Sequence, residues 1–414
     1  MAHSSHISGI FRLASHIMEK TEIWQRLGSI ETPAFVYEPG RMLNSINWLK
    51  RESHPLSWQL LFAMKAFSVS EGLKSVADLL DGFAASSLFE ATLARDIMRH
   101  SGTVHFAAPA LRHNEIAQIA GLCDFVTINS LGQWYRFKER LAGRTSCGLR
   151  VNPMLEFVDD ERYAPCRKNS KLGIPIDALE RIVESDLASL EHIEGIHFHS
   201  NCDSDELSEL LETVERLSDR VGGLLRQLKW VNIGGGYLYR ESESLEPFKD
   251  AIRLLTTKYA VKVFVEPGAY IVRDAAYLVS TILDIVESGA KKVAILDTSV
   301  NHMPEVFEYQ FEPDVIGHHG EGEFEYILAG CTCLSGDVFG EYRFDEHLEI
   351  GSQVIFSNVG AYTLVKAHMF NGVNLPTIYS LTESGELVMK KRFSYEDFAS
   401  RCGVETRVTA TAKN

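Results

Sequence analysis

Short runs of apolar and β-branched residues recur between residues 59 and 265, separated by segments in which Leu, Ile and Val return every three or four residues. This alternation predicts strands that alternate with amphipathic helices. The eight predicted strands are Gln59–Met64, Leu80–Ala85, Val104–Ala107, Phe125–Ile128, Cys147–Val151, Gly195–His199, Trp230–Ile233 and Val263–Val265. Eight such units predict a (β/α)8 barrel, whose active site lies where the strands end.

After about residue 275 the pattern changes to strand-like segments joined by turns, which predicts a second domain built from β strands. Those segments are Tyr277–Val286, Lys292–Asp297, Phe324–Ala329, His347–Ile350, Gln353–Phe356, Ile378–Leu381 and Glu386–Lys390. Thr32–Tyr37 is also strand-like and is expected to join them. We therefore expect a barrel over residues 38–275 and a β-sandwich or barrel-like domain over residues 1–37 and 276–414.

The chain is acidic: Lys and Arg number 41 against 56 Asp and Glu, a formal net charge of −15 over 414 residues. This balance argues against a nucleic-acid binder, which would normally have a basic face. It is compatible with a cationic small-molecule substrate, and equally with acidity that only maintains solubility. No apolar run is long enough to span a membrane or to form a signal peptide. With 7 Cys, an odd number, we expect a cytoplasmic protein with mostly free thiols.

Polar residues follow the ends of several predicted strands, where a barrel places its active site. Lys65 ends an apolar strand, and a lysine whose pKa is lowered there can form a Schiff base through its neutral amine. The simpler interpretation is a lysine that reaches from the strand end into solvent. His197 and His199 share one strand face, where they would bind a metal, stack on a cofactor ring or form hydrogen bonds in the core. No HExxH motif or CxxC pair supports zinc, and we expect no metal.

Two further motifs follow the last two predicted strands of the barrel. Gly234–Gly236 occupies a loop where barrels often bind phosphate through backbone N–H groups, although a glycine triplet also forms ordinary turns. Glu266 would hold a pyridinium nitrogen protonated, or pair with a nearby Arg or Lys. In the β domain, Cys331 and Cys333 are either buried thiols or a redox pair, although their CxC spacing is not that of a CxxC motif.

In this order along the chain, the motifs resemble those of the fold-type III pyridoxal phosphate decarboxylases, the alanine racemase and ornithine decarboxylase family. The strings that carry the resemblance are FAMKAF, GFAASSLFEATLAR, GIHFHSNCDS, NIGGG, NHMPEVFEYQF, GCTCLSGDVFG and GAYTLVKAHMFNG, between about residues 30 and 380. Within the family they are most similar to carboxynorspermidine/carboxyspermidine decarboxylases. The resemblance implies an α/β fold, with a TIM-like (β/α)8 barrel that binds pyridoxal 5'-phosphate and a C-terminal all-β domain like that of alanine racemase.

The resemblance also implies how the cofactor is held. Lys65 would bind it covalently, His199 would stack on its ring, and Glu266 would bond the ring nitrogen. The remaining cofactor contacts implied are Arg150 near the phenolic oxygen, and Gly234, Gly235, Gly236, Tyr362 and Cys202 around the phosphate.

On the substrate side, the resemblance implies a homodimer with shared active sites. Cys333 would donate a proton and Asp337 would contact a distal amine, each in the partner subunit's site. His302 and Glu305 lie in a segment that the resemblance places near the substrate. The implied reaction removes CO₂ from the α-amino-acid end of a carboxylated polyamine and yields norspermidine or spermidine.

Two residues depart from the family pattern. Ala269 stands where the family usually has Arg or Glu, and Glu305 stands where the polyamine branch has Asp. With the linker-like ending TATAKN, these departures leave open the same decarboxylation of a 3-amino-3-carboxypropyl group in the maturation of a microcin C-type nucleotide-peptide antibiotic. A racemase on the same barrel and a non-catalytic cofactor-binding relative are further alternatives, but the decarboxylase-like CTCLSGD and the retained cofactor residues argue against them.

Overall fold

The computed structural model describes residues 23–28, 30–98, 101–240 and 243–404. The chain divides into two compact units. We name Arg41–Val272 the barrel unit, and Met1–Gly40 together with Arg273–Asn414 the β unit. The first 22 residues of the expected β domain and the linker-like ending lie outside the described residues.

The barrel unit is a closed ring of parallel strands, which confirms the predicted fold class. Its strands are β2 (Gln59–Ala63), β3 (Gly82–Ala85), β4 (Thr103–Ala107), β5 (Phe125–Ile128), β6 (Ser146–Asn152), β8 (Ile193–His197), β9 (Trp230–Asn232) and β10 (Lys262–Val265). Each pairs in parallel with the next, and the pairing of β10 with β2 closes the ring. The short strand β7 (Ile174–Pro175) pairs with β6 beside the ring.

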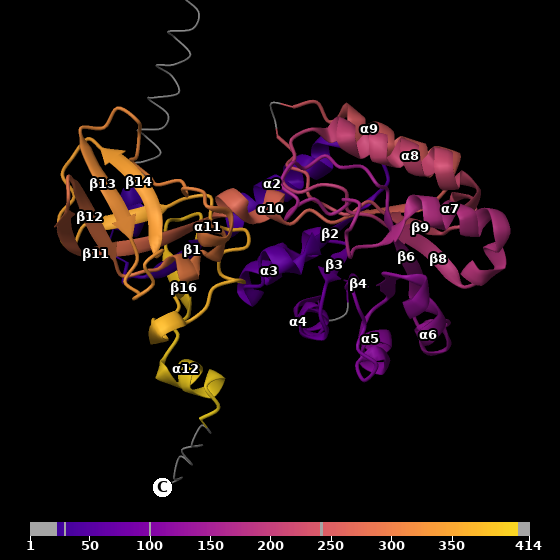
Figure 1. The fold of residues 1–414 in the computed structure, drawn as a ribbon, viewed down its shortest axis with the longest axis horizontal. Coiled ribbons are helices and arrows are strands. Elements are labelled where there is room, and N and C mark those ends of the chain that lie inside the picture. Colours follow the sequence, from indigo (N-terminus) through magenta and orange to yellow (C-terminus); the bar gives the residue numbers. More distant parts are fainter. Residues whose placement is uncertain (1–22, 29, 99–100, 241–242, 405–414) are drawn as a thin grey trace, which may run out of the picture. The chain divides into compact units, whose positions relative to one another are not determined.

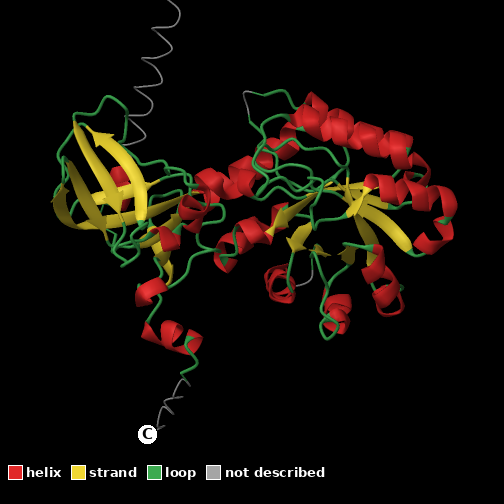
Figure 2. Ribbon diagram, in the orientation of Figure 1, coloured by secondary structure: helices red, strands yellow, loops and turns green. Residues whose placement is uncertain are grey.

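Helices cover the outside of this ring (Figure 1; Figure 2). They are α2 (Pro39–Glu52), α3 (Ser70–Val76), α4 (Leu88–Met98), α5 (Ile116–Leu122), α6 (Leu131–Leu141), α7 (Ile176–Ser185), α8 (Leu207–Leu225), α9 (Glu246–Arg253) and α10 (Ala269–Val272). Helix α6 shows why such segments fold as helices. The Ser130 side chain caps its first turn by accepting from the N–H of Gln133, and Trp134, Phe137 and Leu141 recur on the buried face.

The barrel interior is filled by side chains, and one of them explains two glycines in the strands. Leu61, Trp230 and Phe264 form a buried cluster. A Cβ at Gly195 would lie 2.0 Å from Cδ2 of Trp230, and a Cβ at Gly148 would lie 2.3 Å from its Cη2. Glycine is needed at both positions because the indole occupies the space of their side chains.

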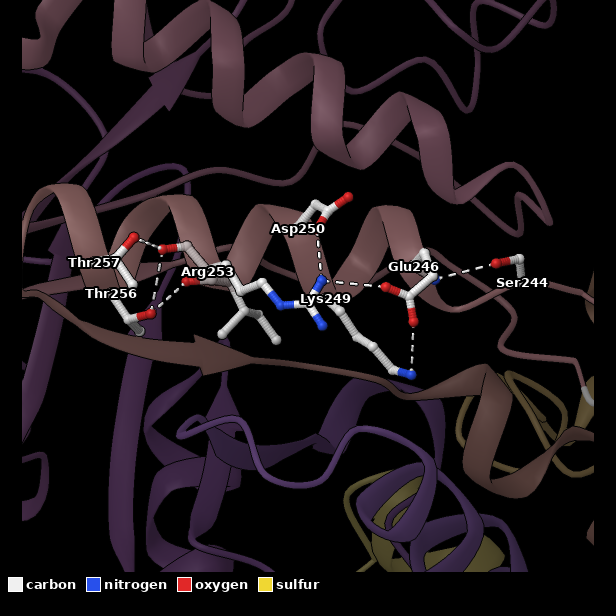
Figure 3. Close-up of polar contacts among 8 residues, drawn as sticks. Ser244, Glu246, Lys249, Asp250, Arg253, Thr256 and Thr257 are labelled. Carbon is white, nitrogen blue, oxygen red and sulfur yellow. Dashed lines mark hydrogen bonds and ion pairs between the residues drawn. The ribbon is translucent and has the colours of Figure 1, made fainter.

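Helix α9 shows how the excess acidic residues are accommodated at the surface (Figure 3). Glu246 pairs with Lys249 at 3.0 Å and with Arg253 at 3.1 Å, and Asp250 also pairs with Arg253, at 2.6 Å. These groups are largely solvated, so each pair adds little to the stability of the fold. Thr256 and its neighbour donate hydroxyl hydrogen bonds to carbonyls of the preceding turn, where the helix widens into a π-helical segment.

The β unit is built on one sheet. Its strands are β1 (Ala34–Tyr37), β11 (Ala276–Ser288), β12 (Lys291–Leu296), β13 (Phe324–Ala329), β14 (Val338–Phe344), β15 (Gln353–Phe356), β16 (Thr377–Leu381) and β17 (Leu387–Lys391). They follow the order β14-β13-β12-β11-β1-β16-β17, and β15 pairs with β11. The strand that precedes the barrel in sequence, β1, thus lies between β11 and β16. Short helices α11 (Pro304–Tyr309) and α12 (Tyr395–Arg401) complete this unit.

One predicted strand of the β unit is wrong. His347–Ile350 is not a strand, and the strand in this region is β14, which the pattern did not predict. Side chains hold the segment instead of a backbone ladder: the His347 ring packs on Phe324, and the N–H of Leu348 donates to the Tyr326 hydroxyl at 3.2 Å. Leu348 and Ile350 alternate with polar residues, and this alternation resembles that of a strand although the segment forms no ladder.

Candidate active site

The carboxyl ends of neighbouring barrel strands bring several of the expected residues together. Strand register pairs Arg150 of β6 with His197 of β8, and His197 with Asn232 of β9. Lys65 lies in the 3-10 turn directly after β2, and Glu266 directly follows β10. Since all these strands run in parallel, the five residues share one end of the barrel.

Glu266 is fixed by its neighbours on β9. Asn232 Nδ2 donates to Glu266 Oε1 at 2.6 Å, and the backbone N–H of Glu266 donates to the carbonyl of Gly234 at 2.7 Å. Burial raises the pKa of Glu266, whereas the Asn232 hydrogen bond and the charges of Lys65 and Arg150 lower it. The result is an oriented carboxylate with cationic neighbours.

Lys65 follows the neighbouring strand, because β2, which precedes it, pairs with β10, which precedes Glu266. Its side chain is exposed to solvent, but the surrounding protein still removes enough water to lower the pKa of its ammonium. Glu266 opposes this shift, and Arg150 adds to it. A lowered pKa increases the fraction of neutral amine, the form that reacts with an aldehyde.

His199 is held as a neutral imidazole. The backbone N–H of Gly235 donates to His199 Nδ1 at 3.1 Å, which makes Nδ1 an acceptor and assigns the ring proton to Nε2. Burial, followed by the charges of Lys65 and Arg150, lowers the pKa of His199 well below its usual value. A neutral flat ring at the mouth is suited to stacking on an aromatic cofactor.

The glycine triplet is required by close backbone approaches. Gly234 and Gly236 have positive φ angles of +69° and +90°. A Cβ on Gly235 would lie 2.1 Å from the carbonyl oxygen of Glu266, and one on Gly236 would lie 2.1 Å from that of Asn201. The triplet therefore brings the loops after β8, β9 and β10 together, and two of its N–H groups donate to Asn232 and His199.

Arg150 and Cys202 complete the expected cofactor residues of the barrel unit. Burial lowers the pKa of Arg150, although its intrinsic value keeps the guanidinium charged, and Glu266 opposes the shift. Cys202 is half-buried in the loop after β8, and its backbone N–H donates to Asn201 Oδ1 at 2.9 Å. Ala269, one of the two departures, is buried at the start of α10.

In the β unit, Asp337 anchors the loop that carries Cys333. Asp337 is buried and accepts hydrogen bonds from the N–H of Val300 at 2.8 Å, from the N–H of Thr332 at 3.0 Å and from the Thr332 hydroxyl. Cys333 is exposed, and its backbone N–H donates to Asn371 Oδ1 at 2.8 Å. The loop thus presents a thiol on a rigid backbone.

His302 is buried beside this loop. Its Nδ1 shares a hydrogen bond of 2.8 Å with the Thr298 hydroxyl, whereas its Nε2 finds no partner among the described residues. Burial lowers the pKa of His302 to about 4, and Asp337 opposes that shift. His302 is therefore neutral at physiological pH.

Glu305 already holds a cation of this chain. Lys366 Nζ lies 3.0 Å from Glu305 Oε1 and 2.7 Å from Glu308 Oε2, and it donates to the Tyr309 hydroxyl at 3.2 Å. The ammonium also lies 6.0 Å from the ring centre of Tyr362. Burial lowers the pKa of Lys366, but the two carboxylates outweigh it and raise the pKa. Glu305, which is expected to contact the substrate, thus belongs to a cluster of acidic and aromatic side chains around the Lys366 ammonium.

Sequence reasoning gave no role to Asn232, Lys366 and Glu90, which the structure connects to the expected site, and it left metal binding, ring stacking and core hydrogen bonds open for His197. Asn232 and His197 contact Glu266, and Lys366 pairs with Glu305. Glu90 accepts from the N–H of Ser86 at 2.6 Å and interacts electrostatically with Lys65. Asn232 and Glu90 stand inside the motifs NIGGG and GFAASSLFE, so their motif position was an available signal.

The described residues hold no group of three metal-ligating side chains. Within the same part of the chain, no helix has the length and apolar character needed to cross a membrane.

Comparisons with known proteins point in one direction. The family model described as "Pyridoxal-dependent decarboxylase, pyridoxal binding domain" matches residues 46–273. A carboxynorspermidine/carboxyspermidine decarboxylase from Campylobacter jejuni is 34% identical, over 90% of this chain and 98% of that protein. A carboxyaminopropylagmatine decarboxylase from Synechocystis sp. is 33% identical, over 91% of this chain and 97% of that protein. Among solved structures, the Campylobacter jejuni carboxynorspermidine decarboxylase complexed with norspermidine matches with a TM-score of 0.81 and 32% identity, over 90% of this chain and 100% of that chain.

Proposed function

Because the chain belongs to the pyridoxal-dependent decarboxylases, we propose that it removes CO₂ from the α-amino-acid end of a carboxylated polyamine and yields norspermidine or spermidine. The observation that carries this proposal is the likeness to the Campylobacter jejuni decarboxylase, which extends over 98% of that protein. The grouping of Lys65, His199 and Glu266 at one end of the barrel supports it independently.

These residues fit pyridoxal 5'-phosphate. The set contains a lysine with a lowered pKa, an oriented carboxylate, a neutral imidazole and a glycine turn that a Cβ would block. When bound, pyridoxal phosphate supplies an electron sink for the electron pair that departing CO₂ leaves behind.

Each barrel residue then has a physical task. The amine of Lys65 would hold the cofactor's aldehyde carbon, and Glu266 would accept the N–H of the ring nitrogen and so keep the proton there. His199 would cover one ring face, and the Gly235 N–H keeps that imidazole in one tautomer. Arg150 and the glycine turn would bind the oxygens of the cofactor.

The β unit would complete the site in a second copy of the chain. We propose that the exposed thiol of Cys333 donates the proton that replaces CO₂ and that Tyr362 adds a donor to the phosphate. We also propose that Asp337 contacts a distal amine. The residue is buried, but its three hydrogen bonds leave one of about four acceptor positions of the carboxylate unused. A mass measurement in solution tests the dimer: a monomer that is fully active would refute shared sites.

The distal end of the substrate is the open specificity question. In the Synechocystis relative the name states a guanidino substrate, carboxyaminopropylagmatine. That relative is 33% identical over 91% of this chain, so its named substrate is a second candidate, and Glu305, one methylene longer than the aspartate of the polyamine branch, is a residue at which the distal group can differ. The nucleotide-peptide alternative would instead need space for a bulky distal group that carries no ammonium.

A comparison of substrates tests the proposal. We expect kcat/KM for carboxynorspermidine or carboxyspermidine to exceed that for carboxyaminopropylagmatine and for a 3-amino-3-carboxypropyl nucleotide. Lys366→Met should change KM for the polyamines, because Glu305 then lacks its internal cation. Lys391→Met, which breaks an exposed ion pair with Asp397, is the matched control. CO₂ release from the nucleotide alone would refute the polyamine assignment.

A further inference from the structure

His197 has an environment that the roles above do not explain. It ends β8, the residue is 3% exposed, and neither ring nitrogen has a hydrogen-bond partner among the described residues. Leaving such groups buried and unpaired costs free energy, so native proteins rarely do so without a reason.

One ring nitrogen of His197 approaches the Glu266 carboxylate. His197 Nε2 lies 3.8 Å from Glu266 Oε2, whereas Asn232 occupies the other oxygen of that carboxylate, at 2.6 Å. A distance of 3.8 Å is too long for a hydrogen bond, but a small side-chain rotation closes it. Glu266 is thus held from one side, and His197 faces its second oxygen.

Burial and the neighbouring charges determine whether the His197 ring is neutral or protonated. Arg150 is its register partner on β6, and Lys65 and His105 also act on it. Burial and these neighbours lower the pKa of His197 well below its usual value. The ring is therefore neutral, with one N–H to donate.

We infer that His197 is a positioning residue for Glu266, whose Oε2 would accept the Nε2–H of His197 when the carboxylate is charged and holds the cofactor's ring nitrogen. Together with Asn232, it would hold the carboxylate from both sides. A neutral donor stabilises a buried carboxylate without placing a second positive charge beside the ring nitrogen. The inference rests on the proposed binding of pyridoxal phosphate.

Two substitutions separate this role from a merely structural one. His197→Met removes the donor at similar volume, and His197→Gln retains an amide N–H near the position of Nε2. His105→Met is the matched control, because His105 is also buried inside the barrel but bonds Thr103 Oγ1 at 3.1 Å. The readouts are the affinity of the cofactor-free protein for pyridoxal phosphate, from absorbance titration, and the Tm of the cofactor-free protein.

We expect His197→Met to weaken cofactor affinity about tenfold or more, the loss typical of one hydrogen bond to a charged group. His197→Gln should recover most of the affinity, and His105→Met should lower Tm without changing affinity. In a Glu266→Gln background, His197→Met should have no further effect on affinity. If His197→Met does not fold, His197→Asn replaces it, because its shorter amide does not reach Oε2.

Two results would overturn the inference: equal affinity losses in His197→Met and His105→Met, or an undiminished loss in the Glu266→Gln background. Wild-type protein that fails to bind pyridoxal phosphate would overturn the proposed function, and this inference with it. Wild-type binding with unaffected His197 variants would refute the inference alone.

Discussion

The substitution Asn232→Asp tests whether the side chain at position 232 controls the protonation of Glu266, as the hydrogen bond between them implies. Asn232 is buried; its Nδ2 donates to Glu266 Oε1 at 2.6 Å, and its Oδ1 accepts from the N–H of Gly234 at 2.9 Å. Aspartate keeps the acceptor for Gly234 but replaces the donor with a second carboxyl oxygen. Two carboxyls at this distance share one proton, which titrates above the ordinary carboxyl range.

The sign of the pH effect follows from that shared proton. The pKa of the carboxyl pair is higher in the folded than in the unfolded chain. The pair's contribution to stability is therefore present at low pH and is lost as pH rises through the folded-state pKa. A shift of about two to three pKa units corresponds to about 3 to 4 kcal/mol. For a domain of this size, that loss lowers Tm by roughly 10 °C.

The assay is the Tm of cofactor-free wild type and variant between about pH 5 and pH 8. The Tm difference should widen as pH rises. Asn129→Asp is the matched control, because Asn129 has the same pair of bonds, donating to the Lys171 carbonyl at 2.8 Å and accepting from the N–H of Gly173 at 2.8 Å, with no carboxyl partner. A constant Tm difference for Asn232→Asp across this range would refute the coupling.

Three further predictions concern the glycine turn, His302 and the thiol loop. Gly235→Ala should weaken cofactor affinity at least tenfold, because its Cβ would lie 2.1 Å from a backbone oxygen; Gly223→Ala, with nothing within 4 Å, should not. His302 should contribute about 3 kcal/mol to the loss of stability as pH drops from 6.5 towards 4, because only unfolded chains protonate it there, and His302→Gln should reduce the fall by that amount. Cys333→Ala should lower kcat with unchanged cofactor affinity in spectroscopic titrations, whereas the exposed Cys402→Ala should change neither.

The barrel could be predicted because its strands are short, apolar and regularly spaced, and because hydrophobic periodicity reports burial directly. Each of the eight predicted runs overlaps a strand of the ring. The β unit was harder to predict. Strand β14 contains Gly340 and follows a loop rich in small residues, whereas His347 and Leu348 contact side chains of β13 without joining a ladder.

The candidate site was predictable where the residue type alone indicates the chemistry, as for Lys65 and Glu266. It was not predictable where a residue's role depends on which side chain it contacts in the fold. The place of Asn232 inside NIGGG was a signal, but its bond to Glu266 was not visible in the sequence, and neither was the pairing of Lys366 with Glu305, because each partner is distant along the chain. The sequence shows a net charge of −15 but not where its acidic residues lie. Only the structure separates acidic residues in solvated pairs, such as those on α9, from the half-buried Glu305.

The most direct test of the central claim is the stoichiometry of the reaction. Purified protein supplied with pyridoxal phosphate and carboxynorspermidine should release one CO₂ for each norspermidine formed, and Lys65→Ala should release none. Wild-type protein that binds the cofactor yet returns carboxynorspermidine and carboxyspermidine unchanged would contradict the account.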